Sequence, residues 1–245
     1  MINEIILAIV QAMTEFLPVS SSGHLALVSN LISSPNLFFF TALHLASLLA
    51  VLIFTRKEIV NLISFRKEYR KLWIYLIIAT IPAGIVGLLF NDQIENAFNS
   101  LLFLGTAFIF TGIVLLLTKF ARVRGKFNWK NSLFIGLMQM IALFPGVSRS
   151  GMTISAGLFS GIDREKAARF SFLLFIPVSL AAFALELKDA YFSLSLAVSF
   201  LICFILSLVF LKILTILVKR GKFWIFAFYC WLIGIITLTL YLLKF

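Results

Sequence analysis

Ionisable and hydroxyl side chains gather in two short stretches of this sequence, each of which interrupts an apolar run. In the first stretch, residues 11–24, Gln11 and Glu15 are spaced four residues apart and therefore share one face of a helix. Pro18 ends that helix. The polar residues that follow are Ser20, Ser21, Ser22 and His24. A carboxylate beside hydroxyls and an imidazole can act as a base that activates a nucleophile or a water molecule.

The second stretch, residues 145–155, supplies the opposite charge. Arg149 stands between Ser148 and Ser150, and Thr153 follows one helical turn later. A guanidinium is a rigid fork of donors that suits phosphate oxygens. The serines can also cap half-helices that begin near residues 24 and 151, and the free backbone N–H groups of such helix starts attract anions. Taken together, the two stretches predict a site for phosphoryl chemistry.

Structural explanations for the same residues stay open. Glu15 could be neutral, or ion-paired with Arg149, and the serines could do no more than cap helices. A carboxylate in the middle of a membrane costs roughly 2.5–3.5 kcal/mol, which favours a functional role for Glu15. A transporter for anions could carry the same serines and arginine. Glu15 beside His24 favours an enzyme, because an anion carrier gains little from a carboxylate in its binding site.

The elements that must position these residues are membrane helices. Of the 245 residues, 62% are apolar and 13% charged, against about half and about a quarter in a soluble domain. The chain is therefore predicted to be a single all-α integral membrane domain. Its net charge of +11 does not indicate nucleic-acid binding, because the basic residues stand in short breaks between apolar runs. Six transmembrane helices are predicted at residues 37–54, 72–90, 99–118, 170–187, 193–218 and 223–243.

Residues 1–33 and 132–160 are each broken in the middle, and the halves are too short to cross a bilayer. They predict two re-entrant helix pairs. Basic residues then fix the topology, since four loops carry 17 of the 21 lysines and arginines. These loops are 55–71, 119–131, 161–169 and 219–222. All four fall on one side of the membrane, which is the cytoplasmic side by the positive-inside rule.

The two broken segments resemble each other at an offset of 128 residues. Six identities carry this likeness: Gln11, Phe16, Val19, Ser20, Ser22 and Gly23 match Gln139, Phe144, Val147, Ser148, Ser150 and Gly151. Each half, 1–118 and 132–245, contains one re-entrant pair and three spans. Because three is odd, the second half must insert upside down. This predicts an inverted-topology repeat with a site near the membrane midplane.

At these residues the sequence resembles the undecaprenyl-diphosphate phosphatase family, the bacitracin-resistance phosphatases of bacterial membranes. The motifs are QAMTEFLPVSSSGH at 11–24 and PGVSRSGMTIS at 145–155, with further similarity at 42–52 and 167–174. The resemblance implies hydrolysis of a polyprenyl diphosphate to the monophosphate and inorganic phosphate, which recycles the lipid carrier of peptidoglycan synthesis. It also implies a divalent cation, Mg²⁺ or Ca²⁺, and a location in the cytoplasmic (inner) membrane with the site open to the outside.

Roles follow from the resemblance motif by motif. It implies Glu15 as the base or metal-linked group, Arg149 as the phosphate-binding arginine, and Ser21 as the nucleophile with His24 as its acid–base partner. Whether Ser21 or His24 attacks stays open. The substrate-binding residues are expected to be Gln11, Ser20, Ser22, Ser148, Ser150 and Thr153. Gln11 stands where many members carry Glu, which leaves the number of metal ions open.

Two features outside the motifs, His44 and a pair of glycines, have both structural and functional interpretations. His44, inside the span 37–54, is predicted to be a satisfied buried histidine, with a site-lining role as the alternative. Gly157 and Gly161 favour close packing within the subunit over a dimer seam, while a homodimer stays open. The runner-up function is a transporter or flippase of polyprenyl phosphate or another anion. A structural scaffold would leave Glu15 and Arg149 without a purpose.

Overall fold

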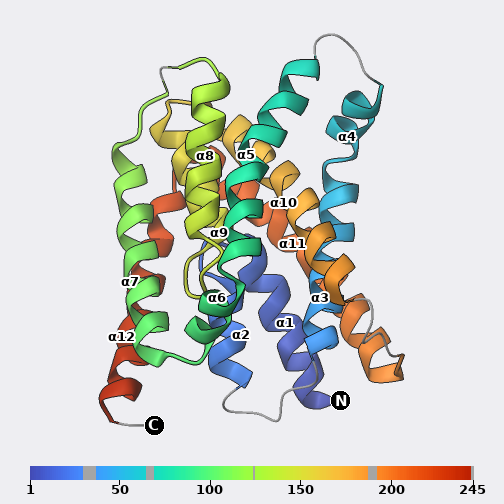
Figure 1. The fold of residues 1–245 in the computed structure, drawn as a ribbon, viewed down its shortest axis with the longest axis vertical. Coiled ribbons are helices and arrows are strands. Elements are labelled where there is room, and N and C mark those ends of the chain that lie inside the picture. Colours follow the sequence, from blue (N-terminus) through green and yellow to red (C-terminus); the bar gives the residue numbers. More distant parts are fainter. Residues whose placement is uncertain (30–36, 65–68, 124, 187–191, 244–245) are drawn as a thin grey trace.

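The computed structural model describes residues 1–29, 37–64, 69–123, 125–186 and 192–243, and in these ranges the regular structure is helical throughout. The helices, shown in Figure 1, are α1 (Ile2–Phe16), α2 (Ser21–Ser29), α3 (Leu37–Phe54), α4 (Arg56–Ile63), α5 (Arg70–Leu89), α6 (Asn91–Phe98), α7 (Leu101–Leu117), α8 (Trp129–Ile141), α9 (Arg149–Phe159), α10 (Arg164–Glu186), α11 (Leu194–Lys219) and α12 (Phe226–Leu242). Short 3₁₀ turns, η2 (Thr118–Phe120) and η4 (Phe223–Ile225), extend α7 and precede α12.

The membrane-protein prediction is confirmed by helix length and composition. Five helical segments among the described residues are long and apolar enough to span a bilayer: α5, α7 with η2, α10, α11, and η4 with α12. A sixth span results if α3 and α4, bent by 75° at Thr55, are taken together. Each of the six predicted spans thus corresponds to a long helix. Residue 187, at the end of one prediction, lies outside the described residues.

Two segments predicted as loops between spans contain short helices instead. Residues 55–71 include α4, and residues 91–98 form α6. In the first of these segments Arg66 and Lys67 lie outside the described residues, as does Arg124 of the loop 119–131.

The two broken segments have the same shape but face opposite ends of the molecule. α1 rises from the lower end of Figure 1 to the middle and α2 returns to the lower end, whereas α8 descends from the upper end and α9 returns to it. Residues 30–33 of the first predicted re-entrant pair lie outside the described residues. The assignment of these pairs as re-entrant stays a prediction, since it depends on where the bilayer lies.

Helix packing crosses between the two halves of the chain. α1 packs against α11, α8 packs against α5, and α7 packs along α12. Small residues permit the closest of these contacts. A Cβ added to Gly136 of α8 would lie 2.7 Å from the carbonyl oxygen of Ala79 in α5, and one added to Gly112 of α7 would lie 2.4 Å from the ring of Trp231 in α12.

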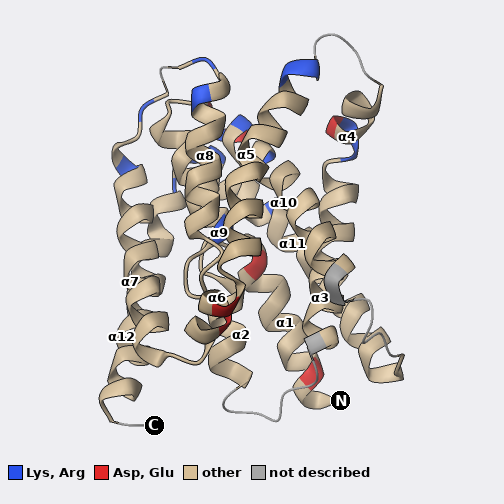
Figure 2. Ribbon diagram, in the orientation of Figure 1, with Lys and Arg blue, Asp and Glu red and all other residues tan. Residues whose placement is uncertain are grey.

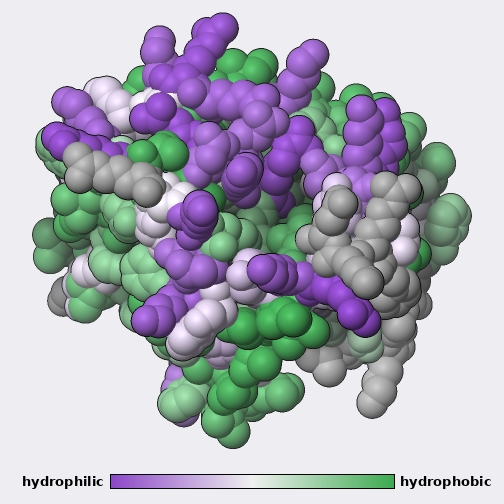
Figure 3. All heavy atoms as spheres, turned by 90° about the horizontal axis from the view of Figure 1, so that it is seen from above, coloured by the Kyte–Doolittle hydropathy of each residue, from purple (hydrophilic) through white to green (hydrophobic). Residues whose placement is uncertain are grey.

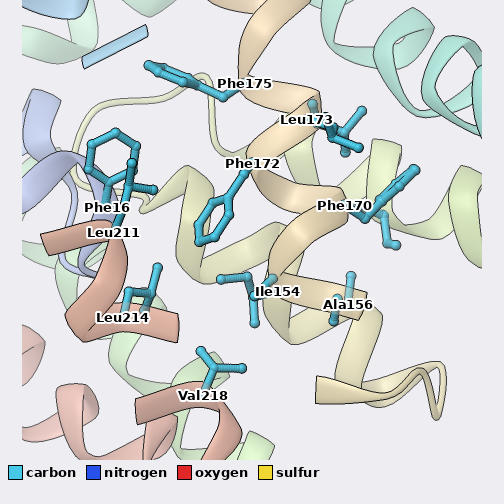
Figure 4. Close-up of a cluster of buried hydrophobic side chains, with 14 of the residues drawn as sticks. Phe16, Ile154, Ala156, Phe170, Phe172, Leu173, Phe175, Leu211, Leu214 and Val218 are labelled. Carbon is cyan, nitrogen blue, oxygen red and sulfur yellow. The ribbon is translucent and has the colours of Figure 1, made fainter. Parts of the chain in front are cut away.

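The largest buried cluster is built around α10 (Figure 4). Phe172 and Phe175 of this helix extend toward Phe16 at the end of α1, and the rings of Phe16 and Phe175 meet edge to face at 5.9 Å. Ile154 of α9 and Leu211 of α11 belong to the same cluster. α10 therefore fixes the last turn of α1, which carries Glu15, relative to α9, which begins with Arg149.

Charge is distributed unevenly along the long axis. Most lysines and arginines gather at the upper end, while aspartate and glutamate are spread along the axis, at α4 near the top, in the middle, and at α6 and the start of α1 lower down (Figure 2). Viewed from above, hydrophilic side chains cover much of the upper face (Figure 3). At this end Arg169 of α10 forms ion pairs with Glu58 and Glu165, and Lys219 of α11 lies 2.8 Å from Glu165. The basic residues are concentrated at one end, as the sequence predicts; which compartment that end faces stays a prediction.

Candidate active site

The two chain breaks touch each other in the middle of the molecule. A Cβ added to Gly23, in the first turn of α2, would lie 2.9 Å from Cα of Gly146 and 2.6 Å from the ring of Phe108. Likewise, a Cβ added to Gly151, in the first turn of α9, would lie 3.5 Å from Cβ of Pro18. The glycines therefore allow the two half-helix starts to meet, although they are more than a hundred residues apart in the chain.

The two breaks share the same local hydrogen bonding. The Ser20 hydroxyl accepts from the Gly23 N–H at 3.3 Å, and the Ser148 hydroxyl accepts from the Gly151 N–H at 3.1 Å. Both are caps on a helix start, as the sequence predicts for these serines. The backbone differs in one respect, since Ser20 has φ = 67°, a left-handed conformation that is uncommon outside glycine.

Between the breaks lies a cavity of about 290 Å³, near the lower end of the range for small-molecule sites. It is lined by Thr14, Glu15, Ser20, Ser21, Ser22, His44, Ala142, Leu143, Val147, Ser148, Arg149, Phe175, Val178, Ser179 and Ala182. Hydroxyls and ionisable groups come mainly from α1, α2, α3 and the start of α9. The side chains from α10 are mostly apolar. The cavity thus combines polar groups from the breaks with an apolar wall.

Glu15 is the centre of the polar groups, and its side chain is 4% exposed. Its Oε1 is ion-paired with Nη2 of Arg149. Its Oε2 accepts hydrogen bonds from the Ser21 hydroxyl at 2.6 Å and from Nε2 of Gln11 at 2.9 Å. A buried carboxylate is tolerated because both oxygens have partners, and the short contact to Ser21 places a base on a hydroxyl that faces the cavity.

Arg149 has room for a further anion. Its guanidinium lies over the ring of Phe175, 3.9 Å from the ring centre, which fixes its plane. One terminal nitrogen, Nη2, binds Glu15, while the other, Nη1, is buried and has no hydrogen-bond partner among the described residues. A buried donor without a partner is costly. An incoming phosphate oxygen would supply the missing acceptor.

His44 enters the site from α3. Its Nε2 lies 3.4 Å from Oε2 of Glu15, and its Nδ1 lies 2.9 Å from the carbonyl oxygen of Phe40. The prediction that it is a satisfied buried histidine is therefore the weaker of the two interpretations, and the site-lining alternative describes where it lies. The sequence signal for this position is an ionisable side chain within a membrane span.

Comparison with known proteins identifies the family of this chain. The model of the family described as "Bacitracin resistance protein BacA" matches residues 4–236, a range that contains both chain breaks. The chain belongs to the BacA family. The resemblance noted in the sequence motifs is thereby confirmed.

Curated relatives of this BacA chain match it over nearly their whole length. A protein of Thermosipho africanus is 44% identical, covering 96% of this chain and 98% of the relative. One from Methanococcus maripaludis strain C7 is 42% identical over 97% and 99%, and one from Methanobrevibacter smithii is 41% identical over 96% and 95%. Each of the three is named undecaprenyl-diphosphatase.

In this BacA chain His24 lies apart from Glu15. Its Nδ1 lies 2.8 Å from the carbonyl oxygen of Ser20, and its Nε2 lies 2.9 Å from the hydroxyl of Tyr229 in α12. Its ring stacks on Tyr229 with centroids 5.6 Å apart and meets Phe108 edge-on at 5.2 Å. His24 is not part of the cavity lining, so the structure does not bring the expected acid–base partner to Ser21.

Of the predicted substrate-binding residues, Gln11 is fully buried and lies outside the cavity lining, behind Glu15, and the other five divide into two groups. Ser20, Ser22 and Ser148 line the cavity. Ser150 instead donates to the carbonyl oxygen of Leu17 at 3.3 Å, and Thr153 donates to the carbonyl oxygen of Arg149 at 2.8 Å. These two side chains therefore bind backbone carbonyl groups at the breaks and are not part of the cavity lining. Sequence reasoning missed Thr14, Phe175 and Ser179, whose residue types carry no signal of a site.

The donor set for a divalent cation in this BacA chain is small. The described residues contain no group of three His, Cys, Asp or Glu side chains close enough to hold a metal ion. Among the described residues that line the cavity, Glu15 is the one carboxylate. Beside it, Oε1 of Gln11 is buried and has no hydrogen-bond partner among the described residues. One carboxylate and one free amide oxygen fit a cation such as Mg²⁺, which takes most of its other ligands from substrate phosphates and water.

Proposed function

We propose that this chain hydrolyses undecaprenyl diphosphate to undecaprenyl monophosphate and inorganic phosphate. The names of its BacA-family relatives support this substrate. The observation that carries the proposal is that one buried carboxylate, Glu15, binds a cavity hydroxyl and a cavity guanidinium at the same time. Base, nucleophile and anion clamp are the three parts that phosphoryl transfer requires.

In the proposed reaction Ser21 attacks the terminal phosphorus of the diphosphate. Glu15 accepts the hydroxyl proton through the contact of 2.6 Å as the Oγ–P bond forms. The bond from phosphorus to the bridging oxygen breaks, which releases the monophosphate lipid and leaves a phosphoserine. A water molecule then attacks phosphorus and keeps its protons on the released phosphate (H₂PO₄⁻), while the Oγ–P bond breaks and Glu15 returns its proton to Oγ.

Arg149 stabilises the charge that develops on the transferred phosphoryl group. Its unpartnered Nη1 is the donor available for a phosphate oxygen, and Phe175 keeps the guanidinium plane fixed during the reaction. A divalent cation, when bound by Glu15 and Oε1 of Gln11 together with diphosphate oxygens, would neutralise part of the substrate charge. The backbone N–H groups at the start of α9 add further positive potential.

The same proposal places the protein in the cytoplasmic membrane with the cavity open to the outside. The upper end, where lysine and arginine gather (Figure 2), would face the cytoplasm. The isoprenoid tail would lie between spans while the diphosphate occupies the cavity. Hydrolysis there would return the carrier lipid to peptidoglycan synthesis and would confer bacitracin resistance.

Transport is the second candidate, and the cross-packing of the helices favours it. α1 on α11 and α8 on α5 are the pairings expected if residues 1–118 and 132–245 form an inverted repeat. Such repeats commonly serve alternating access. The protein could then also move the polyprenyl phosphate product, or another anion, across the membrane.

Phosphate release from detergent-solubilised undecaprenyl diphosphate tests the proposed function. We expect wild-type protein to release phosphate with Mg²⁺ or Ca²⁺, and Glu15→Gln and Arg149→Ala to lose at least about 10²-fold in kcat. Matched controls are Glu95→Gln on α6 and Arg122→Ala, both at exposed positions outside the cavity lining. Absence of phosphate release by the folded wild type with either cation would overturn the phosphatase proposal and leave transport as the function to test.

A further inference from the structure

We infer that Thr111 of α7 is a positioning residue of the active site, which holds the backbone before Arg149 so that the guanidinium meets the phosphate. This inference rests on the proposed phosphatase function and adds to it a residue outside both sequence motifs. Thr111 lies outside the cavity lining, so it can act on the reaction only through the second break.

The hydroxyl of Thr111 binds the second break at two points. It donates to the carbonyl oxygen of Gly146 at 3.1 Å and accepts from the N–H of Ser148 at 3.3 Å. A hydroxyl has one proton and two lone pairs, so both bonds can form at once. All three residues are buried. Loss of the hydroxyl would therefore leave both backbone groups unpaired in the interior.

The turn that Thr111 binds has no helical hydrogen bonding of its own. Gly146 has φ = 86°, in the left-handed region, and Ser148 is the extended N-cap residue of α9. Two more residues on the same face of α7 fit closely against this turn. A Cβ added to Gly146 would lie 2.8 Å from Cβ of Ala107 and 2.9 Å from the carbonyl oxygen of Leu104. Thr111 thus completes a face of α7 that is shaped to the turn.

The bond to Ser148 bears directly on Arg149, which is the next residue and the first of α9. The Ser148 hydroxyl accepts from the N–H of Gly151 at 3.1 Å. Ser148 therefore connects Thr111 to the first turn of α9 through its backbone and its side chain. A shift of this backbone would move Nη1 of Arg149, the donor available for a phosphate oxygen, relative to the cavity.

The first break is bound at the equivalent carbonyl group. Pro18 corresponds to Gly146 at the offset of 128, and its carbonyl oxygen accepts from Sγ of the buried Cys230 in α12 at 3.5 Å. Each break is thus bound by a buried side chain from a long helix of the other half of the chain. A thiol is a weak donor, whereas Thr111 binds two backbone groups. The stronger attachment therefore lies at the break that carries Arg149.

Replacement of Thr111 by valine and by serine separates positioning from packing. Valine keeps the shape of the side chain without its hydrogen bonds, and serine keeps the hydroxyl. We expect Thr111→Val to lower kcat at least about tenfold, because a small misplacement of a catalytic group is costly. KM should change less than about threefold, and Thr111→Ser should keep kcat within about threefold of wild type. Phosphate release from undecaprenyl diphosphate is measured well below the apparent Tm of each variant, so that all are folded.

A double variant shows whether Thr111 acts through Arg149. Added to Arg149→Ala, Thr111→Val should lower kcat by less than about twofold further, because the group that it positions is already gone. End-point release of labelled phosphate measures these slow variants. Thr237→Val in α12 is the matched control, since Thr237 is also fully buried but donates within its own helix, to the carbonyl oxygen of Ile233 at 2.8 Å. It should leave kcat and Tm unchanged.

Three results would overturn the inference while the phosphatase function stands. The first is wild-type kcat in Thr111→Val. The second is an equal loss of kcat in Thr111→Ser, which would indicate a packing role. The third is an undiminished effect of Thr111→Val in the Arg149→Ala protein, which would show that Thr111 does not act through Arg149. Inactive wild-type protein would instead overturn the proposed function itself.

Discussion

Ser21 and Arg149 are the first residues of two half-helices, α2 and α9, and they bind opposite oxygens of the same carboxylate. Their positions differ by 128 residues, the offset that relates the two sequence motifs. The two breaks therefore have equivalent turns but different chemistry, with a hydroxyl at one helix start and a cation at the other. Glu15 has no acidic counterpart in the second break, where Leu143 stands at the equivalent position. Its carboxylate binds both Ser21 and Arg149 and so connects the two helix starts in one site.

The first prediction concerns the attacking group. Ser21→Ala should lower kcat by about 10³-fold or more while KM changes little, because Oγ is lost and the rest of the phosphate contacts stay. Ser22→Ala, next in the chain and also in the cavity wall but without a bond to Glu15, should lose less than about tenfold. Steady-state phosphate release measures both variants.

The covalent intermediate distinguishes Ser21 from His24. Substrate labelled in its terminal phosphate should leave acid-stable phosphoserine on the wild type after a rapid quench, and none on Ser21→Ala. An acid-labile phosphohistidine that disappears in His24→Gln would contradict the assignment of Ser21.

The second prediction concerns the stability of the buried ion pair. Removing Arg149 alone, as in Arg149→Met, leaves Glu15 buried without its cation and should cost about 3–5 kcal/mol in the free energy of unfolding. The double variant Glu15→Gln/Arg149→Met should recover much of this loss, since no charge is then left unpaired. Thermal unfolding in detergent measures the apparent Tm of wild type, both single variants and the double variant. Additive shifts in Tm would show that the two side chains do not interact.

Much of the scaffold could be predicted from the sequence because apolar runs of span length leave few alternatives. The long helices and the two breaks follow from hydropathy and from Pro18 and the glycines. The meeting of Glu15 with Arg149 follows from two opposite charges placed in two similar breaks. In each case one local pattern is sufficient.

The positions of the two histidines could not be predicted in the same way. His44 shares one face of α3 with Thr41 and Ser47, but the sequence does not show which helix that face meets. His24 lies within the motif, and its proximity to Glu15 along the chain is misleading. The left-handed backbone at Ser20 and the hydroxyl of Tyr229, over two hundred residues away, hold its ring outside the cavity.

The third prediction concerns the contact between the breaks. Gly23→Ala places a methyl group 2.9 Å from the Gly146 backbone and 2.6 Å from Phe108, and neither neighbour is the free end of a flexible chain. The breaks must separate, so we expect a loss of about 1–3 kcal/mol in stability together with a loss of activity. Gly84→Ala on α5 is the matched control, because a Cβ there meets nothing within 4 Å. Apparent Tm and kcat should fall for the first variant and hold for the second.

The fourth prediction concerns the cation and Gln11. Oε1 of this side chain is a buried acceptor without a partner among the described residues, next to the carboxylate that is proposed to hold Mg²⁺. Gln11→Glu adds a second carboxylate, so the Mg²⁺ concentration for half-maximal phosphate release should fall. Gln11→Leu removes the oxygen, and that concentration should rise with kcat at saturating Mg²⁺ reduced less than tenfold. Titrations of Mg²⁺ against phosphate release, after removal of bound metal with a chelator, measure both shifts. If the two variants show the same Mg²⁺ dependence as wild type, Gln11 does not contribute to the cation site, and its amide serves only to hold Glu15.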